Sequence, residues 1–186
     1  MRIIAGALKG RRIRTTEGPG YRPATGRVRE SVFSMLESLG VDWPACRAAD
    51  IFAGSGALGI EALSRGAASV LFVELAARAA GLIRTNLEEL GVARERWRLV
   101  RGDALRWLAS ETPLLWDLAF VDPPYGRDAL LPALLHMAER GWLAHGGLLC
   151  AELEAGLELE EPVHPALTLL RDKSYGQTRI LIWRKE

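Results

Sequence analysis

The sequence is poor in several residue types, and each shortage narrows what the protein can be. Its 186 residues include only two cysteines, Cys46 and Cys150, which lack metal-ligand spacing. This excludes a disulfide-stabilised scaffold and predicts buried, reduced thiols in a cytoplasmic protein without a bound metal. No apolar run reaches the roughly 18 residues of a membrane span. The N-terminal residues have no clean apolar core, so we expect neither a signal peptide nor a membrane partner.

Lysine, asparagine and glutamine are also scarce. The chain has 21 Arg against 3 Lys, and its single Asn and single Gln are Asn86 and Gln177. Few Asn and Gln residues are typical of heat-adapted proteins. A GC-rich genome accounts equally well for the excess of Arg.

The charge of the chain is unevenly distributed. The formal net charge is +1, yet residues 1–30 contain eight basic and two acidic side chains, a net of +6. A basic segment on a mildly acidic body suggests an arm that contacts phosphate groups. A solvated basic surface explains the charge alone just as well.

Short apolar runs alternate with stretches of helical spacing along most of the chain. After a first helix predicted near 25–39, further helices are predicted near 58–66, 76–90, 104–110 and 128–141. Strands that alternate with helices predict an α/β fold, in which a mostly parallel sheet carries helices on both faces.

The two ends of the chain depart from this alternation. The last runs, "ALTLLRDKS" and "TRILIWRK", leave no room for a helix and predict an antiparallel pair at the sheet edge. Near the N-terminus, "RIIAG" and "RRIRT" predict a small β-hairpin. We therefore expect a basic hairpin extension over residues 1–24 and a catalytic domain over 25–186.

The stretch "DIFAGSGALG" places three glycines between a predicted strand and a predicted helix. Gly54 and Gly56 allow a tight turn that a ligand can approach closely, and Gly59 allows the helix to pack against the strand. Glu74 ends the next predicted strand, where a carboxylate can accept hydrogen bonds from both ribose hydroxyls. The pattern predicts a nucleoside cofactor, either NAD or S-adenosylmethionine.

Two more carboxylates favour the second cofactor. Asp50 stands directly before the glycine turn, where it suits the ammonium of a methionine moiety better than it suits a pyrophosphate. Asp103 follows the third predicted strand, where it can accept a hydrogen bond from the amino group of adenine.

The motif Asp122-Pro123-Pro124-Tyr125 ends another predicted strand. Consecutive prolines fix the backbone and offer carbonyl groups without N–H groups. Asp122 and the Pro123 carbonyl can accept both hydrogens of a conjugated amine and direct its nitrogen at a sulfonium methyl, while Tyr125 stacks on a flat acceptor. Positioning then supplies most of the catalysis. NAD chemistry has no use for this motif, so the residues favour S-adenosylmethionine.

With both motifs, the chain resembles the class I S-adenosylmethionine-dependent methyltransferases, and most closely the bacterial RsmD family. The resemblance covers nearly the whole chain and includes "RIIAGALKGRRI", "RPATGRVRESVF" and "KSYGQTRILIW". It implies a Rossmann-like, seven-stranded fold and methylation of a guanine N2 amine in 16S ribosomal RNA. The acceptor is expected in a hairpin loop, within a small-subunit assembly intermediate.

The resemblance also assigns residues. The family's cofactor pocket maps onto Asp50, Phe52, Ala53, Gly54, Ser55, Gly56, Glu74, Leu75, Asp103 and Ala104. Its amine-binding motif maps onto Asp122, Pro123, Pro124 and Tyr125. Lys9, Arg11, Arg12 and Arg14 of the predicted hairpin are expected to bind RNA phosphates. Relatives often carry a second polar residue where Ala76 stands, so ribose binding rests on Glu74 here.

Two other functions remain as alternatives. An amino methyltransferase acting on DNA adenine or protein glutamine fits the Asp-Pro-Pro-Tyr motif. The sequence shows no separate domain for recognising such a substrate, which argues against this alternative. A catalytically silent nucleic-acid-binding fold is disfavoured because Asp50, Glu74 and Asp122 are all intact.

Overall fold

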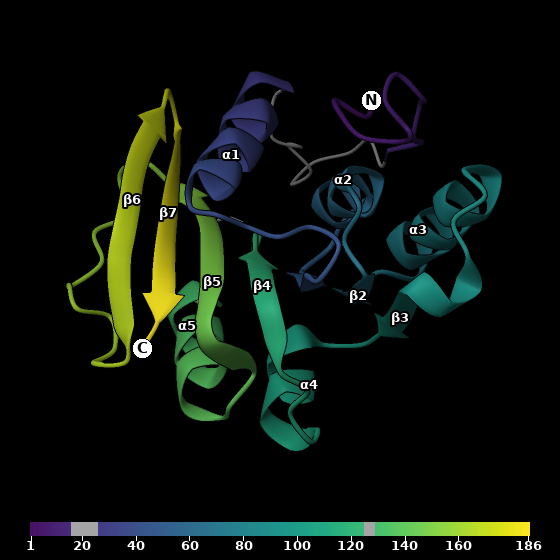
Figure 1. The fold of residues 1–186 in the computed structure, drawn as a ribbon. Coiled ribbons are helices and arrows are strands. Elements are labelled where there is room, and N and C mark those ends of the chain that lie inside the picture. Colours follow the sequence, from purple (N-terminus) through teal and green to yellow (C-terminus); the bar gives the residue numbers. More distant parts are fainter. Residues whose placement is uncertain (16–25, 125–128) are drawn as a thin grey trace.

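A computed structural model describes residues 1–15, 26–124 and 129–186. Within them a seven-stranded sheet lies between two layers of helices (Figure 1). The strands are β1 (Arg47–Ile51), β2 (Ser69–Glu74), β3 (Trp97–Arg101), β4 (Trp116–Val121), β5 (Leu143–Glu154), β6 (Leu167–Tyr175) and β7 (Thr178–Lys185). The helices are α1 (Gly26–Ser38), α2 (Ala57–Arg65), α3 (Ala77–Glu89), α4 (Ala104–Ser110), α5 (Leu130–Glu139) and the short 3-10 helix η1 (Arg94–Arg96).

The sheet has the strand order β3-β2-β1-β4-β5-β7-β6. Strands β1 to β5 pair in parallel, whereas β7 runs antiparallel to both β5 and β6. This confirms the predicted mostly parallel sheet with an antiparallel C-terminal edge. The chain order reverses between β1 and β4, and ligands of open α/β sheets bind beyond the strand ends at such a point.

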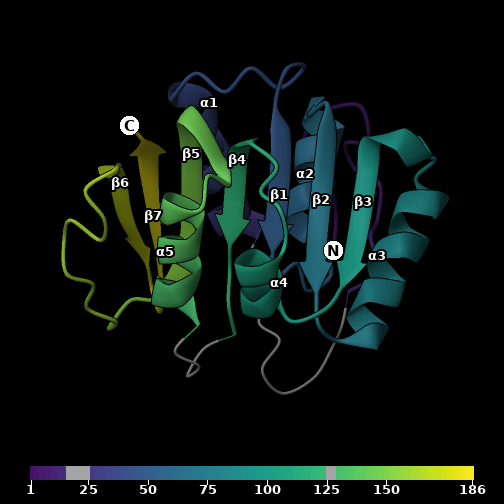
Figure 2. The same ribbon diagram turned by 90° about the horizontal axis from the view of Figure 1, so that it is seen from below.

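Helices cover both faces of the sheet, as predicted. Helices α1, α2 and α3 pack on one face and α4 and α5 on the other (Figures 1 and 2). Because successive strand residues point to opposite faces, Phe120 of β4 joins the first core while Val121 joins the second. If the alternation continues past the end of β4, the residue two positions after Phe120 also points toward the face covered by α1 and α2.

The N-terminal segment, residues 1–15, pairs with itself through a single antiparallel bridge between Arg2 and Arg12. The predicted hairpin is thus present, with very short strands. Buried polar side chains hold the segment on the helices. Glu61 of α2 accepts hydrogen bonds from the N–H groups of Ile4 and Ala5 at 2.8 and 2.9 Å. The predicted boundary between residues 24 and 25 lies outside the described residues and stays a prediction.

The chain's single asparagine also serves this contact. Asn86 of α3 is 2% exposed, accepts from the Arg14 N–H at 2.8 Å and donates to the Arg14 carbonyl at 2.9 Å. Gly6 approaches α2 so closely that an added Cβ would lie 1.8 Å from the Ser64 carbonyl oxygen. The segment is therefore packed against α2 and α3 along its length.

Both cysteines are buried and free, as expected. Burial raises the pKa of the Cys46 thiol to about 12, with smaller contributions from nearby charges. In the described part of the chain, every helix is too short or too polar to cross a membrane.

Candidate active site

The glycine turn follows β1 at the carboxyl edge of the sheet. Its backbone enters the left-handed region at Phe52 (φ 66°), Gly54 (φ 56°) and Gly56 (φ 75°). Phe52 is the one non-glycine residue with positive φ among those described. Such a conformation costs free energy and concentrates at ligand sites. At Gly59 an added Cβ would lie 2.3 Å from Phe72 Cε1, so the helix must carry glycine there to pack on β2.

Glu74 connects the ends of β1 and β2. The residue is 7% exposed, and its carboxylate accepts two backbone hydrogen bonds, from Gly54 N–H at 2.8 Å and from Ala76 N–H at 2.7 Å. A carboxylate has about four lone-pair positions, so it can accept further donors. The neighbouring Leu75 side chain is 57% exposed beside it. The predicted ribose acceptor is therefore held rigidly at the turn.

Asp50 lies beneath the glycine turn and is 2% exposed. Its Oδ2 accepts a hydrogen bond from Gly59 N–H at 2.9 Å, which ties β1 to the first turn of α2. Burial raises the pKa of Asp50 to about 7; the Gly59 hydrogen bond opposes this rise and the charge of Glu74 adds to it. Asp50 thus stabilises the junction between β1 and α2 through a hydrogen bond, in addition to any contact with a ligand.

The remaining predicted cofactor residues lie at the same edge. Ala53 and Ser55 are buried within the turn, while Asp103 and Ala104 follow β3. Asp103 caps α4 by accepting from Arg106 N–H at 2.9 Å, and the rest of its side chain is exposed. The ends of β1, β2 and β3 therefore bring all ten predicted residues to one edge of the sheet.

The amine-binding motif begins directly after β4. The Asp122 N–H donates to the Ile51 carbonyl at 3.4 Å, which places Asp122 beside the end of β1. Pro123 is buried and Pro124 exposed. Tyr125 lies outside the described residues. The described part of the motif therefore adjoins the glycine turn across the switch point of the sheet.

A residue that the sequence analysis missed stands next to Asp122. Strands β4 and β5 pair Phe120 with Cys150 and Val121 with Ala151, so the same register brings Asp122 level with Glu152. Glu152 is 6% exposed. Burial, then the charges of Glu152 and Asp50, raise the pKa of Asp122 well above its ordinary value. The sequence signal was the single charged residue inside the apolar run "GLLCAEL".

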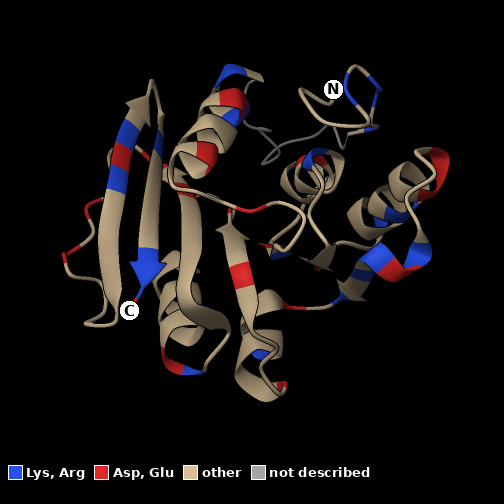
Figure 3. Ribbon diagram, viewed as in Figure 1, with Lys and Arg blue, Asp and Glu red and all other residues tan. Residues whose placement is uncertain are grey.

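The four basic residues predicted to bind RNA are all exposed. Figure 3 shows basic positions, in blue, on the N-terminal segment. Two of them also contact the end of α3. Arg11 Nη2 donates to the Glu89 carbonyl at 2.9 Å, and Arg14 forms an ion pair with the Glu89 carboxylate. Among the described residues, the side chains of Lys9 and Arg12 have no such partner. These two charges are the ones most available to an external phosphate.

The sheet order, the glycine turn at the switch point and the motif after β4 together define the fold of a class I methyltransferase. Residues 1–184 match the model of the family described as "Conserved hypothetical protein 95". The chain belongs to this family, the RsmD family.

Individual relatives agree with this assignment. The ribosomal RNA small subunit methyltransferase D of Escherichia coli K12 is 37% identical over 188 residues, covering 100% of this chain and 90% of that protein. The solved structure of yhhF from Escherichia coli superposes with a TM-score of 0.86 at 33% identity, covering 100% of this chain and 98% of that one. The magnesium protoporphyrin IX methyltransferase of Synechocystis, solved with bound SAM, shares the fold. Its TM-score is 0.67 at 16% identity, covering 86% of this chain and 79% of that chain.

Proposed function

We propose that the protein transfers the methyl group of S-adenosylmethionine to the N2 amine of a guanine in small-subunit ribosomal RNA. The assignment of S-adenosylmethionine as the methyl donor rests on the glycine turn, which Glu74 holds in place. The Glu74 carboxylate accepts from Gly54 and Ala76 and retains lone pairs for ribose hydroxyls. Leu75 and Asp103, both exposed beside the turn, are assigned to the adenine ring and its amino group.

The choice of guanine is carried by one observation, the side-by-side position of Asp122 and Glu152. A guanine edge presents two adjacent donors, N1–H and N2–H2, whereas an adenine edge presents a donor beside an acceptor. Two neighbouring carboxylates match the first pattern. Asp122 is assigned to N2–H and Glu152 to N1–H. Both hydrogen bonds favour the charged carboxylates, and at Asp122 this opposes the burial and the neighbouring charges of Glu152 and Asp50 that raise its pKa.

In the chemical step, the N2 lone pair forms a bond to the methyl carbon while the bond from that carbon to sulfur breaks. The products are S-adenosylhomocysteine and a cationic amine, which becomes acidic and passes a proton to Asp122 or to water. Asp122 and the Pro123 carbonyl orient the nitrogen, and positioning of this kind is worth several orders of magnitude in rate. Tyr125 is assigned to stacking on the base.

Ribosomal RNA is proposed as the substrate because the Escherichia coli relative is named for it and the likeness covers this whole chain. The basic N-terminal segment, packed on α2 and α3, supplies charges for RNA phosphates. We place the reaction in the cytoplasm, on a hairpin loop within an assembling small subunit, since extruded loop bases are the usual targets of such enzymes.

The test is transfer of labelled methyl groups to four substrates: naked 16S rRNA, assembled small subunits, DNA and protein. The labelled RNA is then digested to nucleosides. We expect N2-methylguanosine from an RNA substrate, and the first two arms distinguish free RNA from an assembled particle. Label in adenine or in protein would overturn the guanine assignment and favour the DNA or protein alternative.

A further inference from the structure

Arg29 of α1 is a buried cation that the proposed reaction does not use. The residue is 3% exposed, and its Nη2 donates to the Arg2 carbonyl at 2.9 Å. Its Nε and Nη1 atoms are shielded from solvent and have no hydrogen-bond partner in the described part of the chain. Three of the five guanidinium N–H groups therefore lack an acceptor among residues 1–15, 26–124 and 129–186. Burying an unpaired charge of this kind is costly unless a ligand completes its contacts.

The buried carboxylate whose charge acts on Arg29 is that of Glu61, and it is already engaged elsewhere. Burial lowers the pKa of Arg29, and the charge of Glu61 opposes this with a smaller effect. The Glu61 oxygens accept from the N–H groups of Ile4 and Ala5, and from Arg65 Nε at 3.1 Å. Glu61 thus holds the N-terminal segment and provides long-range attraction, without a hydrogen bond to Arg29 among those observed.

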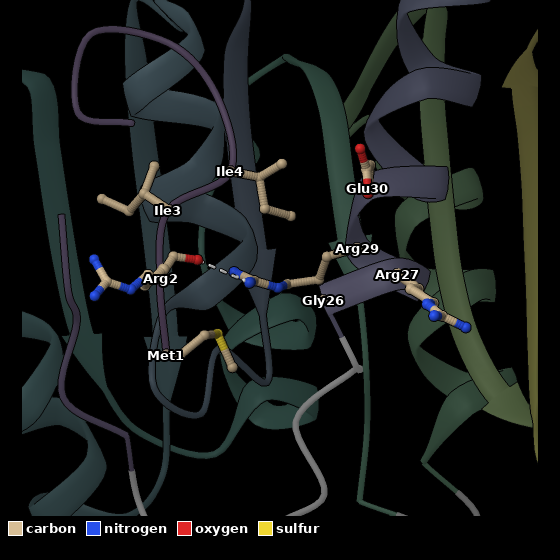
Figure 4. A pocket seen from close by; sticks show the side chains of 8 residues that line it. All are labelled: Met1, Arg2, Ile3, Ile4, Gly26, Arg27, Arg29 and Glu30. Atoms are coloured by element: carbon tan, nitrogen blue, oxygen red, sulfur yellow. Dashed lines mark hydrogen bonds between the residues drawn. The ribbon is translucent and has the colours of Figure 1, made fainter. Parts of the chain in front are cut away.

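Arg29 lines a cleft of about 500 Å³ between the N-terminal segment and the first turn of α1. Figure 4 shows its side chain reaching across from α1 toward the Arg2 carbonyl. The other lining residues are Met1, Arg2, Ile3, Ile4, Gly26, Arg27 and Glu30. Gly26 begins the 13-residue helix α1, whose first N–H groups and partial positive charge favour an anion. Glu30 is the one acidic group among these lining residues and is exposed.

The cleft lies at the same edge of the sheet as the proposed acceptor site. In the next turn of α1, the Ser31 hydroxyl contacts the Tyr175 hydroxyl. Tyr175 pairs with Thr178, and Thr178 pairs with Glu154 at the carboxyl end of β5. The first half of α1 is therefore beside the strand end that carries Glu152. A chain whose guanine reaches Glu152 and Asp122 can place a neighbouring nucleotide along α1.

We propose that this cleft binds a backbone phosphate of the RNA substrate, with Arg29 as its main partner and the first turn of α1 as a second source of donors. The proposal rests on the proposed function, because it takes the ligand to be RNA. Met1 and Ile4 provide an apolar wall for the attached sugar. Lys9 and Arg12 are exposed and are not among the residues that line this cleft.

The main experiment compares Arg29→Gln with Arg106→Gln in the full-length protein. Arg106 is an exposed residue of α4, on the opposite face of the sheet, so the control loses the same charge elsewhere. Binding of a small-subunit rRNA hairpin transcript is measured over a range of salt concentrations. For Arg29→Gln we expect about tenfold weaker binding and a salt slope smaller by about 0.7–0.9, the value for one lost phosphate contact. Affinity for S-adenosylmethionine should match the wild type.

Two outcomes of this comparison overturn the proposal. If Arg29→Gln binds RNA as Arg106→Gln does, the cleft makes no phosphate contact. If Arg29→Gln loses affinity for S-adenosylmethionine while RNA binding stays unchanged, the anion is the cofactor's carboxylate instead. A wild-type protein that methylates no ribosomal RNA would overturn the proposed function. The anion site in the cleft would then be tested by the phosphate titration described next.

A second measurement covers the case in which Arg29→Gln does not fold. Inorganic phosphate is titrated into the wild-type protein while the Nε–H resonance of Arg29 is followed by NMR, with Arg29→Lys used to assign that resonance. A saturable shift of the Arg29 signal that is absent from Arg106 supports an anion site in the cleft. No shift at millimolar phosphate overturns it, whatever substrate the enzyme methylates.

Discussion

The carboxylate of Glu74 accepts a hydrogen bond from the Gly54 N–H group at 2.8 Å, so the residue assigned to the ribose also shapes the turn that receives the cofactor. Glu74→Ala should weaken S-adenosylmethionine binding by roughly 1–3 kcal/mol, the usual cost of losing a charge-assisted partner. Because the turn loses two acceptor contacts, the melting temperature should fall as well. Calorimetric titration and thermal unfolding measure the two effects. Glu88→Ala, an exposed change on α3, is the control, and an unaltered cofactor affinity in Glu74→Ala would remove the ribose assignment.

The buried Asp50 predicts a stability that depends on pH. Its pKa is raised from 3.8 to about 7, so between these values the native state binds more protons than the unfolded state. The stabilising contribution is complete below about pH 4 and is lost as the pH rises to about 7, at up to about 1.4 kcal/mol per pH unit. In Asp50→Asn this loss should disappear. The free energy of unfolding of both proteins is measured by urea denaturation at several pH values. An equal dependence on pH in the wild type and in Asp50→Asn would contradict the prediction.

Asp122 is expected to control the rate of methyl transfer. Asp122→Ala should reduce the single-turnover rate at least ~100-fold, as for other lost transition-state contacts, with little change in cofactor or RNA affinity. Asp122→Asn should keep partial activity, because its side-chain oxygen still accepts a hydrogen bond. A near wild-type rate in Asp122→Ala would show that the Pro123 carbonyl and Tyr125 suffice.

Glu152 should affect the pH profile of the same reaction. The raised pKa of Asp122 means that the wild-type rate increases with pH as Asp122 loses its proton. Glu152→Gln removes a neighbouring negative charge, so the profile should move to lower pH. It also replaces an acceptor for guanine N1–H, so discrimination against substrates with adenine in place of guanine should weaken. An unshifted profile would mean that Glu152 does not act on Asp122.

The exposed basic residues of the N-terminal segment give a prediction about RNA binding. Lys9→Glu with Arg12→Glu should weaken RNA binding and reduce its salt dependence, leaving cofactor affinity nearly intact. Arg98→Glu with Arg106→Glu reverses two exposed charges elsewhere and serves as the matched control. Filter binding at several salt concentrations distinguishes the pairs. Equal RNA affinity and equal salt dependence in the two pairs would mean that the segment only packs on the helices and does not bind RNA.

Much of the fold could be read from local periodicity. Helix ends predicted from apolar spacing lie within two residues of the observed ones, because an amphipathic helix and a buried strand each leave a pattern in consecutive residues. The glycine turn, Glu74 and the residues after β4 were likewise predicted at the strand ends, since each follows an apolar run. Parallel strands bring such positions to one edge of the sheet whatever the order of the strands.

The contacts between distant parts of the chain were decided only by the tertiary structure. Glu152 lies beside Asp122 because β5 pairs with β4 in one particular register, which no local pattern specifies. Asn86 and Glu61 looked like ordinary polar positions on helices, yet they bind the backbone of the N-terminal segment. Arg29 stands between apolar positions of α1, and its burial depends on residues 1–4 lying against that helix. Periodicity reports which side of an element is buried, whereas the identity of the partner depends on long-range packing.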